Sequence, residues 1–80
     1  MDEGLKKLID LKPGEKGIVM AVRGGWGLMR RVAELGLTPG TEVIMIRGAP
    51  FRGPVEVLVR GVVVALGRGV AVKILVKPIR

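Results

Sequence analysis

The 80-residue chain is long enough for one compact domain, and 49% of it is hydrophobic, mostly Val, Leu and Ile with only two aromatic residues. It contains no His, Cys, Ser, Tyr, Asn or Gln, which excludes disulfides, thiol chemistry, Cys or His metal sites and the usual nucleophile–base pairs of enzymes. Its net charge is +7, and no apolar run reaches the roughly 20 residues that span a bilayer.

The first 23 residues predict a capping turn and one strand. Residues 3–11 have a partly helical apolar spacing but are too few for an independent helix, so we expect one helical turn that caps the fold. Pro13 and Gly14 predict a turn, because Pro restricts φ and Gly tolerates positive φ. The run 17–23 is rich in Val and Ile and predicts the first strand.

The strongest helical signal covers residues 26–35. A Gly-Gly pair at 24 and 25 ends the preceding strand. Leu28, Val32 and Leu35 then recur at spacings of four and three residues, which predicts one apolar face directed at the core.

A complete stop signal follows this helix. Gly36 stands where a left-handed C-cap is expected, and Leu37 can fold back onto the last turn. Pro39 prevents the helix from continuing, and with Gly40 it forms a tight turn. This turn leads into the second predicted strand, 41–47.

The second half of the chain predicts three further strands. In 54–60, Val alternates with other side chains, as in a half-buried strand. Gly61 predicts a tight hairpin into the strand 62–66. A glycine-rich turn at 67–69 precedes the last predicted strand, 70–77.

These elements predict one mainly β domain over residues 1–80. Short strands joined by tight glycine turns pair antiparallel and are typical of small barrels. We therefore expect an SH3-like barrel of about five antiparallel strands with one α-helix inserted after the first strand. Both faces of 17–23 and 41–47 are apolar, more than a barrel interior buries, so the helix, a protein partner or a second copy should cover the rest.

Four segments form an ordered set of motifs. They read Leu-x-Pro-Gly-Glu-x-Gly at 11–17, Arg-Arg-Val-Ala-Glu-Leu-Gly-Leu-Thr-Pro-Gly-Thr-Glu-Val at 30–43, Ala-Pro-Phe-x-Gly-Pro-Val at 49–55 and Ala-Leu-Gly-Arg at 65–68. The set covers nearly the whole chain, and 30–43 is its most specific part. On these motifs the chain resembles the FeoA domain family.

The resemblance implies an SH3-like barrel with an accessory role in ferrous iron uptake. It implies a non-enzymatic cytoplasmic protein, able to lie at the inner face of the membrane, that binds the cytosolic region of the ferrous iron permease FeoB. It brings no catalytic residue, metal ligand or cofactor. A similar domain lies at the C-terminus of iron- and manganese-dependent transcriptional repressors, but this chain lacks their DNA-binding helix-turn-helix and their metal site.

The candidate partner-binding residues are aromatic or basic: Trp26, Arg30, Arg31, Phe51 and Arg52. Trp is enriched at the centres of protein interfaces, and two arginines follow this Trp one turn later. The structural alternative is that the Trp covers the open end of the barrel. The residues assigned to turns and caps are Gly14, Gly17, Gly36, Pro39 and Gly40.

Two other functions remain open at this point. The net charge of +7 motivates a nucleic-acid-binding barrel, whose affinity would fall steeply with salt. Against it, two aromatics offer little stacking surface, and dispersed Lys and Arg without Asn, Gln or Cys are typical of thermophilic proteins. The second alternative is a metal-responsive domain that uses the seven scattered carboxylates and is stabilised by Fe²⁺ or Mn²⁺.

Overall fold

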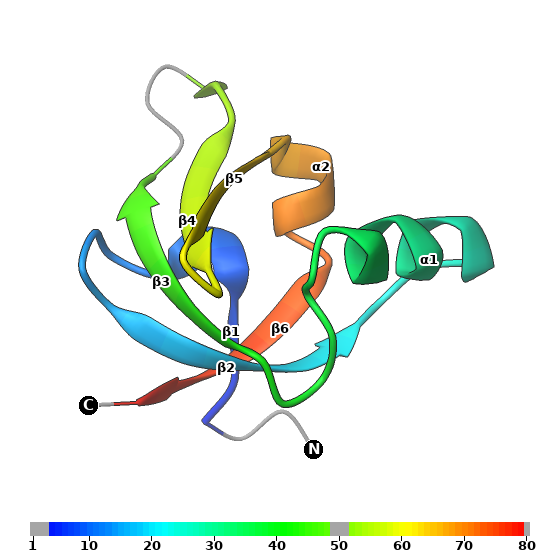
Figure 1. The fold of residues 1–80 in the computed structure, drawn as a ribbon, viewed down its shortest axis with the longest axis horizontal. Helices are drawn as coiled ribbons and strands as arrows, with labels where there is room; N and C mark the ends of the chain where they lie inside the picture. Colours follow the sequence, from blue (N-terminus) through cyan, green and yellow to red (C-terminus); the bar gives the residue numbers. More distant parts are fainter. Residues whose placement is uncertain (1–3, 49–51, 80) are drawn as a thin grey trace.

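The computed structural model describes residues 4–48 and 52–79. Within them, six strands form one antiparallel sheet in the order β1-β6-β2-β3-β4-β5 (Figure 1). The strands are β1 (Lys6–Lys7), β2 (Lys16–Val22), β3 (Glu42–Arg47), β4 (Val55–Val59), β5 (Val62–Leu66) and β6 (Ile74–Ile79). The helices are α1 (Trp26–Glu34), α2 (Arg68–Ala71) and the 3₁₀ turn η1 (Leu8–Asp10).

The core lies against one face of the curled sheet. The alternation predicted for 54–60 is observed, because Val55, Val57 and Val59 are buried while Glu56 and Leu58 are only half-buried. Side chains outside the long strands complete the core: Leu8 from η1, Leu11, Val32 from α1, Leu37 and Ala71 from α2. Each long strand therefore contributes one apolar face, and the helices close the open sides.

The mainly β, antiparallel prediction is confirmed, with two differences. The sheet has six strands because β1 pairs with β6, Lys6 opposite Val76 and Lys7 opposite Leu75. It is also not a closed barrel, since within the described residues β1 and β5 form separate edges. The helical turn predicted within 3–11 is present as the 3₁₀ turn η1, but it is confined to Leu8–Asp10 and follows the unpredicted strand β1. This arrangement satisfies backbone groups on β6 and buries Leu8 completely.

The prediction for the region after β5 was wrong. A turn at 67–69 and a strand over 70–77 were expected, but α2 spans Arg68–Ala71 and β6 begins only at Ile74. The Ala71 and Val72 N–H groups donate to the carbonyls of Gly67 and Arg68, both at 3.0 Å. A short apolar run fits either a buried strand or a helical turn, and here burial of Ala71 favours the turn.

The end of α1 forms a Schellman motif. Gly36 takes a left-handed conformation with φ +91°, and its N–H donates to the Ala33 carbonyl at 2.9 Å. The Leu37 N–H donates to the Val32 carbonyl at 3.1 Å. Both Leu37 and Val32 are buried, so the reversal of the chain also brings two apolar side chains into the core.

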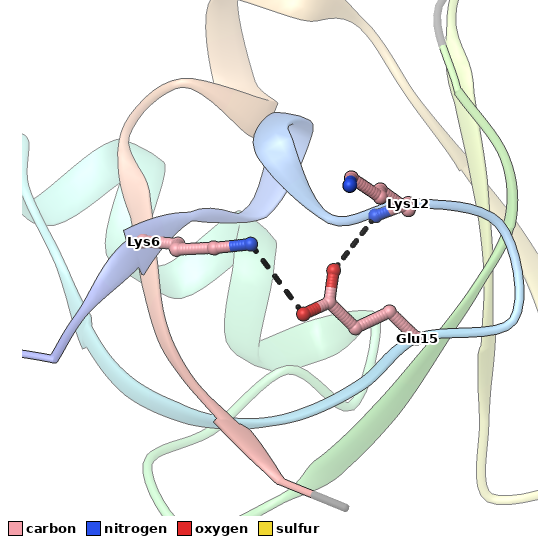
Figure 2. Close-up of polar contacts among 3 residues, drawn as sticks. All are labelled: Lys6, Lys12 and Glu15. Atoms are coloured by element: carbon pink, nitrogen blue, oxygen red, sulfur yellow. Dashed lines mark hydrogen bonds and ion pairs between the residues drawn. The ribbon is translucent and has the colours of Figure 1, made fainter.

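Glu15 ties the N-terminal segment to the start of β2 (Figure 2). Its carboxylate accepts a hydrogen bond from the Lys12 backbone N–H at 2.9 Å and lies 3.4 Å from the Lys6 Nζ. The Lys12 N–H is the main cause that lowers the pKa of Glu15 below its usual value, and the Lys6 charge adds to it. Burial acts in the opposite direction.

We expect the variant Glu15→Gln to have a lower Tm than the wild type at neutral pH. A carboxylate with a depressed folded-state pKa stabilises the fold above its ordinary pKa of 4.5, and this contribution is lost as the pH falls through the folded-state value. The Tm difference should therefore shrink as the pH falls below 4.5 and through the lower folded-state pKa of Glu15. Thermal unfolding followed by circular dichroism checks this, and a pH-independent difference would contradict it.

Candidate protein-interaction surface

The outward side of α1 presents an aromatic and basic surface. Trp26 begins the helix and is 85% exposed. Arg30 lies one turn later on the same side, and Met29 beside it is 44% exposed. Val32 is the only residue of α1 that is buried, so the helix attaches to the sheet along a narrow stripe and stands at one side of the molecule (Figure 1).

The apolar face predicted for α1 is only partly directed at the core. Val32 is buried and Leu28 is half-buried, but Leu35 is 41% exposed, so the prediction was wrong for this residue. Leu35 is the C-cap, and its N–H donates to the carbonyls of Arg31 and Val32. The chain turns away from the helical path here, and this turn leaves the Leu35 side chain in a surface cleft.

A cleft of about 90 Å³ separates α1 from the end of β5 and α2. The residues that line it are Leu28, Arg31, Val32, Leu35, Ala65, Leu66, Gly67 and Val70. Arg31 is the single charged residue in this lining. The cleft can therefore receive a small apolar group, and a carboxylate beside that group would meet a guanidinium.

The structure unites some of the predicted partner-binding residues and separates others. Trp26, Arg30 and Arg31 all lie on α1. Arg52 lies elsewhere, with φ +64°, and lines a depression of about 410 Å³ together with Lys7 and Arg68. Figure 1 shows α1 and the start of β4 on different sides of the molecule. Phe51 lies outside the described residues.

The residues assigned to turns and caps fall into two groups. Gly14, Gly36 and Gly40 lie in turns with φ of +86°, +91° and +93°, and Pro39 lies in the same turn as Gly40. Gly17 instead lies inside β2. A Cβ on Gly17 would lie 3.2 Å from the Cβ and Cγ2 of Val76, so this glycine permits close packing of β2 against β6.

The surplus apolar residues of β2 and β3 do not form one exposed face. The pairing registers shift between residues 19 and 21 and between residues 45 and 47, which leaves Met20 and Ile46 at bulges. These two residues are 45% and 41% exposed, whereas their neighbours Ile18 and Ile44 are half-buried. Cover of Met20 and Ile46 by a partner stays a prediction.

Sequence reasoning missed a depression of about 550 Å³ on the outer side of β3 and β4. The Thr38 and Thr41 hydroxyls lie 2.9 Å apart there, and the Arg60 guanidinium donates to Thr41 Oγ1 at 3.5 Å. Ile44 and Leu58 form the apolar part of the lining. A hydroxyl or carboxylate group is the chemistry these atoms suit. One signal was available, because the chain's two hydroxyls flank a single Pro-Gly turn.

Two negative findings apply to the part of the chain that the structure describes. No three acidic side chains gather there in an arrangement that could hold a metal ion. No helix among those residues has the length and hydropathy to cross a membrane.

Comparison with known proteins identifies the family. The FeoA domain model matches residues 6–78. A Methanocaldococcus jannaschii protein provisionally named Fe(2+) transport protein A is 38% identical over 66 residues, which cover 82% of this chain and 78% of that protein. The crystal structure of an iron uptake regulatory protein, FeoA, superposes with a TM-score of 0.88 at 33% identity and covers 94% of this chain and 99% of its own.

A further structure is similar in fold. Stenotrophomonas maltophilia FeoA in complex with zinc, described as a prokaryotic SH3 domain protein, has a TM-score of 0.76 at 29% identity and covers 94% of this chain and 96% of its own. The SH3-like prediction is thereby confirmed. Family match, sequence relative and structures agree over most of the chain, which belongs to the FeoA domain family of iron transport proteins.

Proposed function

We propose that this protein is a non-enzymatic accessory subunit of a ferrous iron uptake system, and that it binds the cytosolic region of the membrane ferrous iron permease. Membership of the FeoA family supports the role in iron transport. The missing His, Cys, Ser and Tyr support action by contact rather than by catalysis. A cytoplasmic location follows from the position of this partner.

The observation that carries the proposal is the exposure of Trp26. A Trp that served only the fold would bury most of its large apolar ring. Here the ring is 85% exposed at the first turn of a helix that contributes Val32 to the core and packs Leu28 against it. A solvent-exposed Trp with arginines beside it is the composition of an interface centre.

The charge of α1 indicates the character of the partner. Arg30 and Arg31 are both exposed, and the whole chain carries +7. Complementary charge speeds encounter and orients the partners, so the contacting region of the permease should be acidic. The affinity between this protein and the permease region should then decrease as the salt concentration rises, because the charges on both lie at the surface and are screened.

We expect Trp26→Ala to weaken binding of the permease's cytosolic region by about 10- to 100-fold, the range of interface hot spots. Isothermal titration calorimetry with and without nucleotide, at two salt concentrations, measures this. The variant should fold normally, because Trp26 is 85% exposed. Trp26→Phe is the matched control, since it keeps an aromatic ring at the same exposed position and should lose less affinity than Trp26→Ala.

Two results would contradict the proposal. One is the absence of saturable binding between the wild-type protein and the permease region in every condition. The other is binding of RNA or DNA with a steep salt dependence and no permease binding, which would favour the nucleic-acid alternative. If wild type and Trp26→Ala bound the permease region with equal affinity, the accessory role would stand, but α1 would not be the surface that binds the permease.

A further inference from the structure

β5 is an edge strand with an unpaired outer side. Arg60 and Gly61 form a two-residue hairpin, with φ of +51° and +79°, that joins β4 to β5. In such a hairpin the flanking residues form a hydrogen-bonded pair, and bonded pairs then alternate along the ladder. The backbone groups of alternate β5 residues, beginning with Val62, therefore bond to β4. Those of Val63 and Ala65 point outward, and within residues 4–48 and 52–79 no other backbone group bonds to them.

The two edges of the sheet differ in their protection. β1 has two residues and both are Lys, a short charged edge that discourages further pairing. β5 has five residues, all apolar, without Pro and without a register shift. Val62 and Val63 are 60% and 57% exposed. β5 thus lacks the features by which folded proteins block strand addition.

The surroundings of β5 match an extended ligand with acidic ends. Arg31 lines the cleft next to Ala65, and Arg68 follows the strand at the start of α2, where it lines the depression that also holds Lys7 and Arg52. Arg60 precedes the strand in the hairpin, with its guanidinium beside Thr41. This cleft, lined by Leu28 and other apolar residues, offers space for an apolar side chain of an added strand. Backbone pairing would supply affinity, and the arginines would select acidic flanks.

We propose that β5 is a docking edge at which an extended segment of a partner protein, apolar at its centre and acidic at its ends, adds as a seventh strand. This proposal adds a docking site to the proposed function. It depends on that function in one respect, namely that the partner is a protein. The added strand covers Val63 and satisfies the outward N–H and C=O groups of Val63 and Ala65.

The same arginines disfavour a second copy of this chain as the occupant. In a dimer, the β5 strands of two copies would pair antiparallel about a two-fold axis. The outward backbone groups of both strands are all paired only when this axis passes through Val64, which places Val63 opposite Ala65 of the other copy. At both ends of this ladder, the same register also brings the hairpin that holds Arg60 of one copy toward the start of α2, with Arg68, of the other. Like charges brought toward one another at both ends oppose the association of two copies.

The test uses the whole protein and a synthetic peptide, acetyl-Glu-Thr-Val-Thr-Val-Thr-Glu-amide. We expect saturable binding by calorimetry and slower amide exchange at Val63 and Ala65 by NMR. The same peptide with Lys at both ends should bind more weakly by about tenfold or more. A version of the peptide that is N-methylated at the alternate backbone amides that would donate to β5 should not bind. This comparison needs no variant of the protein.

The variant Ala65→Pro removes an outward N–H without removing a bond to β4, and Pro is tolerated on edge strands. We expect it to weaken peptide binding about tenfold, through a lost hydrogen bond and a steric clash. The matched variant Ala65→Gly keeps the N–H and adds no bulk to the cleft, so it should bind the peptide more tightly than Ala65→Pro.

Several outcomes would overturn the proposal. They are no binding of the acid-ended peptide, equal binding of its N-methylated version, and exchange protection of Val63 that rises with protein concentration alone, which would make a second copy the occupant. The peptide assay contains no permease, so failure of the proposed function leaves it unaffected. Conversely, if the permease region bound wild type and Ala65→Pro with equal affinity, β5 would not be its docking edge, and the proposed function would still stand.

Discussion

Leu37→Ala is expected to lower the free energy of unfolding by about 3 kcal/mol, within the 2 to 5 kcal/mol that such truncations cost in packed cores. Leu37 is 1% exposed, and its backbone N–H holds the Schellman motif that ends α1. The truncation leaves a cavity between the end of α1 and the sheet. For a small domain with a total stability of about 5 to 15 kcal/mol, this is a large fraction.

Chemical denaturation followed by circular dichroism measures the effect. Leu35→Ala is the matched control, because it makes the same chemical change two residues earlier, at a side chain that is 41% exposed. We expect it to cost less than about 1 kcal/mol. Equal losses for the two variants would contradict the assignment of Leu37 to the core and of Leu35 to the surface cleft.

Gly17→Ala is expected to cost about 1 to 3 kcal/mol, the range for adding a methyl group to a packed interior. The new Cβ would lie 3.2 Å from two atoms of Val76 and 3.4 Å from the carbonyl oxygen of Lys77. β2 is held between β6 and β3, so the backbone has little room to move away.

Gly48→Ala is the control for this prediction. Gly48 has no positive φ, and a Cβ there meets nothing within 4 Å. It should change stability by less than about 0.5 kcal/mol. Thermal unfolding of both variants checks the difference, and a Gly17→Ala protein as stable as the wild type would show that β2 and β6 can separate without cost.

The local elements were largely predictable because short-range patterns determine them. The Val alternation in β4 and the Gly-Leu-Thr-Pro-Gly stop signal after α1 each reflect constraints that act within a few residues. The family motifs then predicted the SH3-like fold. α2 escaped prediction because a short apolar run fits a buried strand and a helical turn equally well, and contacts with distant residues decide between them.

The candidate site was predictable only in part. Trp26 and Arg30 share one side of α1 because helical spacing places them there, which the sequence alone implies. The separation of Arg52 from them depends on how the β3–β4 connection is placed against the sheet. The β5 edge also depends on tertiary structure, because a strand is an edge only when the order of the whole sheet is known.

The sequence by itself determined the absence of the common catalytic and metal-binding side chains, the positive charge, most strand and helix positions, and the family. Only the tertiary structure decided that the sheet stays open, that Leu35 faces a cleft while Leu37 is buried, and that Gly17 serves packing rather than a turn. The physical reason is the distance along the chain over which each kind of interaction acts. Backbone preferences and periodicity act over a few residues, whereas burial and strand order are set by contacts between segments far apart in the chain.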